Sequence, residues 1–289
     1  GGGKGMRRIY KREDLVAGWE LTRREAKASF ANDDIYIEKL IENPRHIEIQ
    51  ILADSLGNVV YLPERDCSIQ RNNQKIIEES PSRANSDLLE KMYESAVMCA
   101  KACGYEGTGT VEFIVDKYDN YYFMEMNTRI QVEYPVTEMV AGINLIKEQI
   151  RIASGLPLSV KQEDVAANGH AIEVRVNAQN PYDDFRPSCG EISFFLPPGG
   201  LDTRFETALY QGAKILPFYD SMMAKLIVKG STRMDAIKKL RRAVSETIID
   251  GVPTNLGFIY AILYDKDFIL GNIDTNYVAH KEAELLESM

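Results

Sequence analysis

Hydrophobic and polar residues alternate in some short stretches of the chain and recur with helical spacing in others. Residues 47–51 (Ile-Glu-Ile-Gln-Ile) alternate strictly, which predicts a strand with one buried face. Residues 86–103 carry an apolar stripe, which predicts a helix that Ser86 caps and Gly104 ends. The same criteria predict helices over 14–30, 137–154, 235–248 and, last in the chain, 255–264, and strands over 35–39, 59–62, 75–79, 110–116 and 121–126.

From about residue 170 to residue 233, short strands and Gly/Pro turns dominate. Strands that follow one another closely, with helices segregated between groups of them, are typical of an α+β protein with mostly antiparallel sheets. The 289 residues, 45% of them hydrophobic, are enough for a large core and more than one lobe.

Charge and cysteine usage restrict the classes of partner. The net charge is −9, and the Lys and Arg residues are dispersed, so we expect no nucleic-acid partner. No apolar run reaches 18 residues, so we expect no membrane span. The four cysteines complete no zinc-binding set, which predicts reduced thiols in a cytoplasmic protein.

The chain has only three histidines, and no nucleophile motif accompanies them. We therefore expect chemistry based on carboxylates, Lys, Arg and a metal ion.

A predicted hairpin brings two carboxylates together. If its turn is centred between Tyr118 and Asp119, Glu112 lies directly opposite Glu125 on one face, and Asn127 faces the same side. Opposed carboxylates repel unless a cation lies between them, and Mg²⁺ accepts such oxygen ligands. The alternative is a solvated polar face with no metal.

The segment after this hairpin contains Arg129 and Glu133. An Arg can hold a small planar anion through two hydrogen bonds, and a nearby Glu can accept its proton. The alternative is an ordinary surface ion pair.

The chain begins with a glycine-rich stretch made of Gly1, Gly2, Gly3, Lys4 and Gly5. Glycine lets backbone N–H groups close around phosphates, and Lys4 adds positive charge. The spacing is not that of a P-loop, and a flexible linker or tag remnant is the alternative.

Several motifs, in order and spacing, resemble those of biotin carboxylases, over essentially the whole chain. They are residues 1–5, 38–39, 43–50, 64–70, 125–138, 169–177 and 219–222. The resemblance implies an ATP-grasp fold with three parts: a partial lid subdomain (1–40), an ATP-grasp core (41–160) and the biotin carboxylase C-terminal subdomain (161–289).

The resemblance also implies a role for individual residues. Gly1 to Gly5 would form the lid loop over the triphosphate, and Glu112, Glu125 and Asn127 would hold Mg²⁺ or Mn²⁺. The adenine would meet Glu38, Lys39 and Leu40, and the ribose and phosphates would meet His46, Glu48 and Gln70. Bicarbonate would be held by Lys75, Arg129, Gln131 and the Val132 backbone, Glu133 would be the general base, and Arg175 would stabilise the biotin enolate.

The activity implied is ATP-dependent carboxylation of biotin on a carrier protein, with bicarbonate and through carboxyphosphate. Expected partners are a biotin carboxyl carrier protein, a carboxyltransferase and a second copy of the chain. The parent would be an acetyl-CoA carboxylase of fatty acid biosynthesis, or a carboxylase of other acyl-CoA compounds, pyruvate or urea.

Two positions depart from the resemblance, since Asn73 and Tyr134 stand where the family usually has His. The family's amino-terminal domain is also absent, so we expect this piece alone to be inactive or nearly so. The alternatives are another ATP-grasp ligase, such as one like carbamoyl-phosphate synthetase, and an inactive scaffold.

Overall fold

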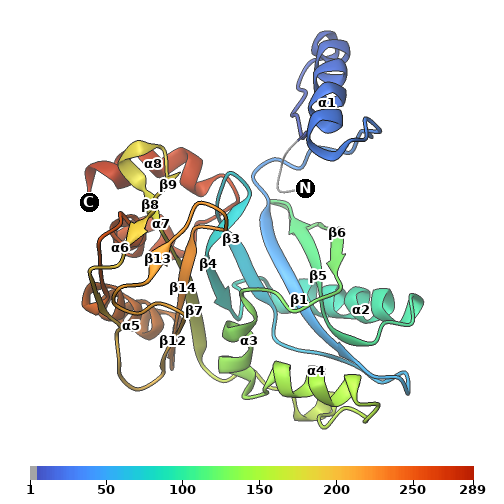
Figure 1. Cartoon of the computed structure of the whole chain (residues 1–289). Helices are drawn as coiled ribbons and strands as arrows, with labels where there is room; N and C mark the ends of the chain where they lie inside the picture. The colour runs from blue at the N-terminus through green and yellow to red at the C-terminus, as the bar shows by residue number, and fades with distance from the viewer. Residues whose placement is uncertain (1–4) are drawn as a thin grey trace.

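The computed structural model describes residues 5–289. One large sheet, made of strands of different lengths, forms its centre (Figure 1). Nine strands make this sheet. They are β1 (Arg45–Ala53), β2 (Val59–Tyr61), β3 (Arg65–Arg71), β4 (Gln74–Ser80), β5 (Gly107–Val115), β6 (Tyr121–Asn127), β7 (His170–Asn177), β12 (Thr203–Thr207) and β14 (Met222–Gly230).

Short two-stranded sheets and helices surround it. The small sheets pair β8 (Gln179–Asn180) with β9 (Arg186–Pro187), β10 (Gly190–Glu191) with β13 (Lys214–Ile215), and β11 (Phe194–Leu196) with β15 (Ile248–Asp250). The α-helices are α1 (Leu15–Phe30), α2 (Ser86–Ala102), α3 (Tyr134–Ala141), α4 (Leu145–Ala153), α5 (Arg233–Glu246), α6 (Leu256–Tyr264), α7 (Lys266–Leu270) and α8 (Tyr277–Glu287). Three 3₁₀ turns are η1 (Arg12–Asp14), η2 (Gln162–Asp164) and η3 (Pro181–Asp183).

The strand order in the large sheet is β12-β14-β7-β4-β3-β1-β5-β6, with β2 paired to β1. Every strand pair among residues 5–289 is antiparallel, which confirms the predicted class. The β4–β7 pairing joins segments that lie far apart in the chain. Through it, the strands at both ends of the order belong to one continuous sheet.

Two main apolar clusters stabilise the two ends of this sheet. At one end, α2 packs Leu88 and Met92 against Ile47 and Ile49 of β1. At the other end, α5 to α8 pack against β7 and β14, with Phe258 among the fully buried side chains. Burial of each large aliphatic or aromatic side chain contributes about 1.5–3 kcal/mol, so these two clusters anchor the strands that carry the polar site.

The predicted strand at 47–51 is confirmed, but its polar face is not solvated. Ile47, Ile49 and Ile51 pack on the α2 side, whereas Glu48 and Gln50 point to the opposite side and are also fully buried. A buried carboxylate requires charged or hydrogen-bonding partners. This face of β1 is therefore the first indication of a functional site.

Four local predictions were wrong. Residues 35–39 form no strand, because Tyr36 and Ile37 are exposed without a neighbouring strand to pair with. Gly142, with φ of 68°, divides the single helix predicted over 137–154 into α3 and α4. The side chain of Asn85, not Ser86, caps α2 by accepting a hydrogen bond from the Leu88 N–H.

The fourth error concerns the end of the chain, since α7 and α8 follow the helix predicted to be the last. Helix α7 has only five residues, and in α8 Ala283 is the one apolar residue between Ala279 and Leu285, so an apolar stripe is difficult to detect in either.

The segment before β1 packs little against the rest. Helix α1 stands away from the sheet (Figure 1), and Ala26 is its one buried residue. Val16 and Phe30 are exposed apolar side chains on it. Within residues 5–289, each helix is too short or too polar to span a bilayer.

Candidate active site

The hairpin of β5 and β6 carries the two acidic residues that the sequence pairs. Glu112 lies opposite Glu125, as predicted, and Asn127 pairs with Thr110 two residues further along the strands. The Asn127 amide nitrogen donates to Glu112 at 3.0 Å and to Glu125 at 3.1 Å. Glu112 is buried and Glu125 is exposed, so this pair joins the interior of the site to solvent.

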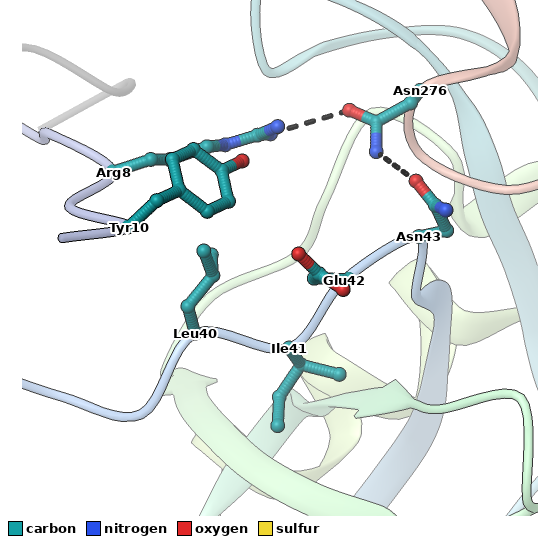
Figure 2. A pocket seen from close by; sticks show the side chains of 7 residues that line it. All are labelled: Arg8, Tyr10, Leu40, Ile41, Glu42, Asn43 and Asn276. Carbon is teal, nitrogen blue, oxygen red and sulfur yellow. Dashed lines mark hydrogen bonds between the residues drawn. The ribbon is translucent and has the colours of Figure 1, made fainter.

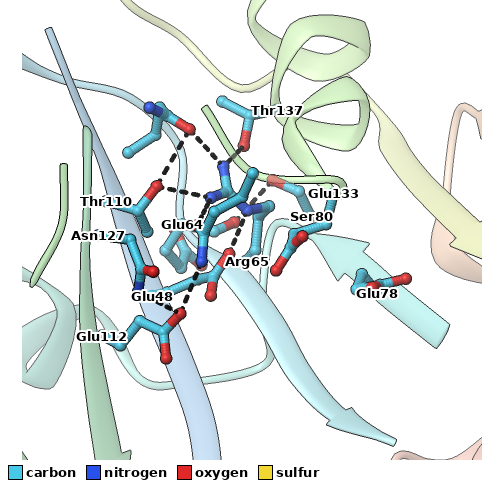
Figure 3. Close-up of polar contacts among 12 residues, drawn as sticks. Glu48, Glu64, Arg65, Glu78, Ser80, Thr110, Glu112, Asn127, Glu133 and Thr137 are labelled. Atoms are coloured by element: carbon cyan, nitrogen blue, oxygen red, sulfur yellow. Dashed lines mark hydrogen bonds and ion pairs between the residues drawn. The ribbon is translucent and has the colours of Figure 1, made fainter. Parts of the chain in front are cut away.

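The buried side of the site is organised by Arg65 of β3, which is completely inaccessible to solvent. Its Nε donates to Glu48 Oε1 at 2.5 Å, and its two terminal nitrogens donate to four further oxygens. Figure 3 shows Arg65 between Glu48, Thr110 and Thr137, with the side chain of Glu112 further along the strand that carries Thr110. The fork-shaped guanidinium suits this role because it satisfies acceptors on several elements in one plane.

Lys75 of β4 links three carboxylates. Its ammonium lies 2.7 Å from Glu48 Oε2, 3.4 Å from Glu112 Oε1 and 2.5 Å from Glu133 Oε1. These acidic groups come from β1, β5 and the N-terminal end of α3. Lys75 therefore brings the predicted metal-binding region and the predicted base into one electrostatic unit.

Glu133 lies where α3 begins and is buried between two cations. Its second oxygen accepts a hydrogen bond from Arg175 Nη2 of β7 at 3.0 Å. Arg175 also donates from Nε to Glu78 of β4 at 2.6 Å. The arrangement brings a carboxylate, an ammonium and a guanidinium into direct contact, and these are groups that can bind a planar anion and accept its proton.

The ionisation of these carboxylates follows from their partners. Burial raises the pKa of Glu48, but Lys75 and Arg65 outweigh it and bring the pKa to about 2. Burial likewise raises the pKa of Glu112, whereas His46 and Lys75 lower it to about 2. For Glu133, burial and Glu48 raise the pKa, and Lys75 with Arg175 nevertheless hold it below the usual range.

The chemistry of the donors fits a hard divalent cation between Glu112 and Glu125. Oxygens or nitrogens of His46, Glu48 and Glu112 also lie within 4.8 Å of one another. Lys75 already occupies the space between Glu48 and Glu112, so the outer side toward Glu125 suits a metal better. There the Asn127 amide would turn over to present its oxygen instead of its nitrogen.

The structure does not bring all predicted anion-binding groups together. Arg129 is exposed, and its guanidinium donates to the Ile130 carbonyl rather than to Glu133. Gln131 is buried, donates to Glu112 at 2.6 Å and accepts from Arg65. The Val132 carbonyl accepts from Lys225 at 2.9 Å.

The predicted nucleotide-binding residues are divided in the same way. His46 and Gln70 are buried together, with 2.8 Å between His46 Nδ1 and Gln70 Nε2, and His46 Nε2 lies 3.1 Å from Glu112. Glu38 is exposed, and the Lys39 ammonium lies 5.3 Å from the centre of the Tyr122 ring. Gly1, Gly2, Gly3 and Lys4 lie outside the described residues, and Gly5 stands in a turn.

Leu40 lines a pocket of about 150 Å³ near Tyr10 and Asn43 (Figure 2). Its wall is held by Asn276, which accepts from Arg8 and donates to Asn43. Small-molecule sites usually measure roughly 300–1,000 Å³, so this pocket is too small for a nucleotide in the observed arrangement.

Three residues of the site had no role in the sequence prediction: Arg65, Glu78 and Glu173. Arg65 lies within the motif 64–70, between the two acidic residues Glu64 and Asp66, and membership of this motif was the available signal. Glu78 and Glu173 are fully buried and meet across β4 and β7. No local pattern indicates a pairing between strands that lie so far apart in sequence.

Two family models match the chain: "Carbamoyl-phosphate synthase L chain, ATP binding domain" over residues 1–161 and "Biotin carboxylase C-terminal domain" over residues 173–280. Biotin carboxylase 1 of Bacillus subtilis is 54% identical over 280 residues, which are 96% of this chain and 62% of the relative. This chain belongs to the biotin carboxylase family.

Solved structures of biotin carboxylases support the same fold. A Campylobacter jejuni biotin carboxylase complex with "beta-gamma-ATP" has a TM-score of 0.94 and 44% identity, with 97% of this chain and 63% of that one covered. The biotin carboxylase domain dimer of Hydrogenobacter thermophilus 2-oxoglutarate carboxylase, with MgADP, ADP and bicarbonate, has a TM-score of 0.95 and 45% identity, covering 99% and 63%. The fold is therefore ATP-grasp, and the chain spans somewhat more than three fifths of these relatives.

The two departures from the biotin carboxylase pattern have local explanations. Asn72 and Asn73, with φ of 51° and 61°, form the two-residue turn between β3 and β4, where Asn tolerates positive φ well. The Tyr134 hydroxyl forms no hydrogen bond with Glu133 and accepts one from Arg204 instead. The Lys225 ammonium lies 4.7 Å from the centre of the Tyr134 ring.

Proposed function

We propose that this protein forms the ATP- and bicarbonate-handling part of a biotin carboxylase, which carboxylates carrier-bound biotin through carboxyphosphate. The observation that supports this best is Glu133, a buried carboxylate held between Lys75 and Arg175 and connected through Lys75 to Glu112. A base, two cations and a metal-binding acid pair in one place are what bicarbonate activation beside a triphosphate requires.

Glu112 and Glu125, with Asn127, would hold Mg²⁺ or Mn²⁺. When bound, the metal supplies positive charge that offsets the charge of the ATP phosphates. His46, Glu48 and Gln70 lie on the adjoining strands and would follow the ribose and phosphates, and Glu38, Lys39 and Leu40 would close on adenine.

Glu133 would accept the bicarbonate proton. The low pKa of Glu133 keeps this carboxylate ionised near neutral pH. Bicarbonate would take over hydrogen bonds from Lys75 and Arg175, and these cations would make its deprotonation less costly. Arg129, Gln131 and the Val132 backbone would complete the bicarbonate site, for which Arg129 must turn inward from its exposed position.

The deprotonated bicarbonate would then attack the γ-phosphorus, releasing ADP and forming carboxyphosphate. Carboxyphosphate separates into CO₂ and phosphate, and the phosphate takes the proton from the biotin ureido nitrogen. Arg175 would stabilise the resulting enolate, which attacks CO₂. Exclusion of water protects carboxyphosphate, which is the expected contribution of the lid segment 1–40.

Further parts of the proposal concern the whole protein. The Hydrogenobacter relative is a dimer, and we propose a homodimer here, with a carrier protein and a carboxyltransferase as partners. The carboxylase to which it contributes is acetyl-CoA carboxylase or one acting on another substrate, since relatives include a 2-oxoglutarate carboxylase. All four cysteines are free, which favours the cytoplasm.

A chimaera tests this function. This chain would replace the matching 280 residues of Bacillus subtilis biotin carboxylase 1, and ATP hydrolysis that depends on both bicarbonate and biotin would be measured. We expect turnover from the chimaera and little or none from residues 1–289 alone. A folded chimaera that binds nucleotide but whose hydrolysis responds to an amine instead would support a different ATP-grasp ligase.

A further inference from the structure

Two carboxylates that the proposed reaction does not use lie directly behind Arg175. Glu78 of β4 and Glu173 of β7 are paired across the antiparallel strands, and both have no exposed surface. Directly opposed side chains in such a pair have Cβ atoms about 4.5–5.5 Å apart. Like charges at that separation repel strongly when water is excluded.

The hydrogen bonds in this region leave most of these oxygens without a partner. Glu78 Oε1 accepts from Arg175, whereas Glu78 Oε2 and both oxygens of Glu173 have no partner. Figure 3 shows Glu78 on its strand, set apart from the contacts that surround Glu133. An ionised buried carboxylate without a partner costs several kcal/mol, and it takes up a proton instead.

The neighbouring cations cannot neutralise both acids. Arg175 is divided between Glu78 and Glu133, and Lys75 is committed to Glu133 and the carboxylates beyond it. Across β14, the Lys225 ammonium is directed to the Val132 carbonyl and to Glu206. From α3, Glu133 adds a further negative charge.

The direction of ionisation agrees with this geometry. Burial raises the pKa of Glu173 well above its usual value, and Glu78 raises it further. Burial also raises the pKa of Glu78, to about 7, although Arg175 opposes the shift. Both shifts are upward, which favours a proton in the pair near neutral pH.

We infer that Glu78 and Glu173 share one proton, and that this singly charged pair is the positioning device that sets how Arg175 divides its hydrogen bonds between Glu78 and Glu133. The role in catalysis rests on the proposed function, whereas the shared proton does not. With one proton, Glu173 can donate to the free oxygen of Glu78, which leaves Glu78 a single charge directed at Arg175.

This arrangement sets how readily Glu133 accepts a proton. If Glu78 were neutral, Arg175 would turn more fully to Glu133 and make it a poorer proton acceptor. If both acids were ionised, the second charge would draw Arg175 away from Glu133 and from the substrate. One shared proton gives an intermediate state in which Arg175 is oriented yet still available.

The shared proton is tested in residues 1–289 by infrared spectroscopy. At pH 7, a wild-type minus Glu173→Gln difference spectrum should show the C=O band of one protonated carboxyl group. The matched control is Glu64→Gln, a buried glutamate whose oxygens accept from Ser82 and Tyr93 and whose removal should leave that band intact. Absence of the band from the Glu173→Gln difference would overturn the inference.

Thermal unfolding gives a second, independent readout. A carboxyl group whose pKa is raised in the folded state destabilises the protein as the pH rises above the pKa that the group has in the unfolded state. Glu173→Gln should therefore raise the Tm at pH 7–8 and change it little near pH 4. A lower Tm at pH 7–8, with the fold intact, would contradict a protonated Glu173.

The positioning role is tested in the active chimaera through the pH profile of kcat. Glu173→Gln mimics the protonated acid. The variant should therefore retain activity, and the alkaline limb of its profile should move to higher pH. Glu78→Gln removes the charge that orients Arg175, so it should lower kcat at least tenfold. Profiles of wild type and Glu173→Gln that superimpose would overturn the positioning role and leave the proposed function standing, because both enzymes would still be active.

Discussion

Glu112 and Glu125 face each other across β5 and β6, and the amide nitrogen of Asn127 lies within 3.1 Å of an oxygen of each. The two residues nevertheless occupy different surroundings. Glu112 is also bonded by Gln131 and lies near Lys75, whereas Glu125 is exposed. A cation that enters from solvent would meet Glu125 first and reach Glu112 at the border of the buried network.

Replacing Lys75 should destabilise the fold. Lys75→Met leaves Glu48, Glu112 and Glu133 without their shared cation, and removal of one partner from a buried ionic network costs about 3–5 kcal/mol. Urea denaturation measures this loss. Lys101→Met, on the exposed end of α2, should change the free energy of unfolding by less than about 0.5 kcal/mol. Equal stabilities of the two variants would show that the carboxylates do not depend on Lys75.

Stability should fall in acid over a defined window. The folded pKa of Glu112 is about 2 and lies below its unfolded value, so its ionisation stabilises the fold above the unfolded pKa, and this contribution disappears as pH falls toward 2. The free energy of unfolding should therefore decrease between about pH 4.5 and pH 2. Glu112→Gln should flatten this decrease by roughly 2 kcal/mol. An unchanged pH dependence in the variant would contradict the assigned ionisation.

Glu133→Gln should separate catalysis from nucleotide binding. In the Bacillus subtilis chimaera, loss of the base should reduce bicarbonate-dependent ATP hydrolysis about 10²–10⁴-fold. The affinity for MgATP should change little, because Glu133 is not among the predicted nucleotide-binding residues. Rates and affinities come from steady-state kinetics and equilibrium binding. A variant with full activity would exclude Glu133 as the base.

Helix α1 should exchange its amide hydrogens far faster than α2. The two helices have similar lengths, but α1 buries only Ala26 whereas α2 buries four residues against the sheet. Few buried contacts permit local opening at low free-energy cost. Hydrogen–deuterium exchange with mass spectrometry compares them within one sample. Equal protection of both helices would contradict the weak packing of the segment before β1.

The amphipathic pattern was sufficient to predict much of the fold, and the hairpin illustrates how. The predicted pairing of Glu112 with Glu125 is confirmed, yet the turn is not centred where we placed it. Nearer the turn, Phe113 pairs with Phe123, and a bulge at Met124 restores the predicted register. A bulge has no clear signal in apolar alternation. The position of the turn was therefore the one feature of this hairpin that the sequence pattern could not predict.

Other features depend on contacts between distant segments. Arg65 connects oxygens from β1, β5 and α3, and Glu173 meets Glu78 because β7 pairs with β4. Burial of the polar face of β1 also depends on Arg65. Local periodicity contains no information on which strands become neighbours, so these contacts could be found only in the folded structure.

Divalent metal binding tests the central claim most directly. Mn²⁺ affinity in the presence of ATP would be measured by electron paramagnetic resonance for wild type, Glu125→Gln and the control Glu90→Gln, an exposed position on α2. Glu125 is exposed, so its replacement should leave the fold intact. If Glu112 and Glu125 share one metal ion, Glu125→Gln weakens Mn²⁺ binding at least tenfold and Glu90→Gln does not. Equal Mn²⁺ affinity in all three proteins would contradict a metal site between these carboxylates.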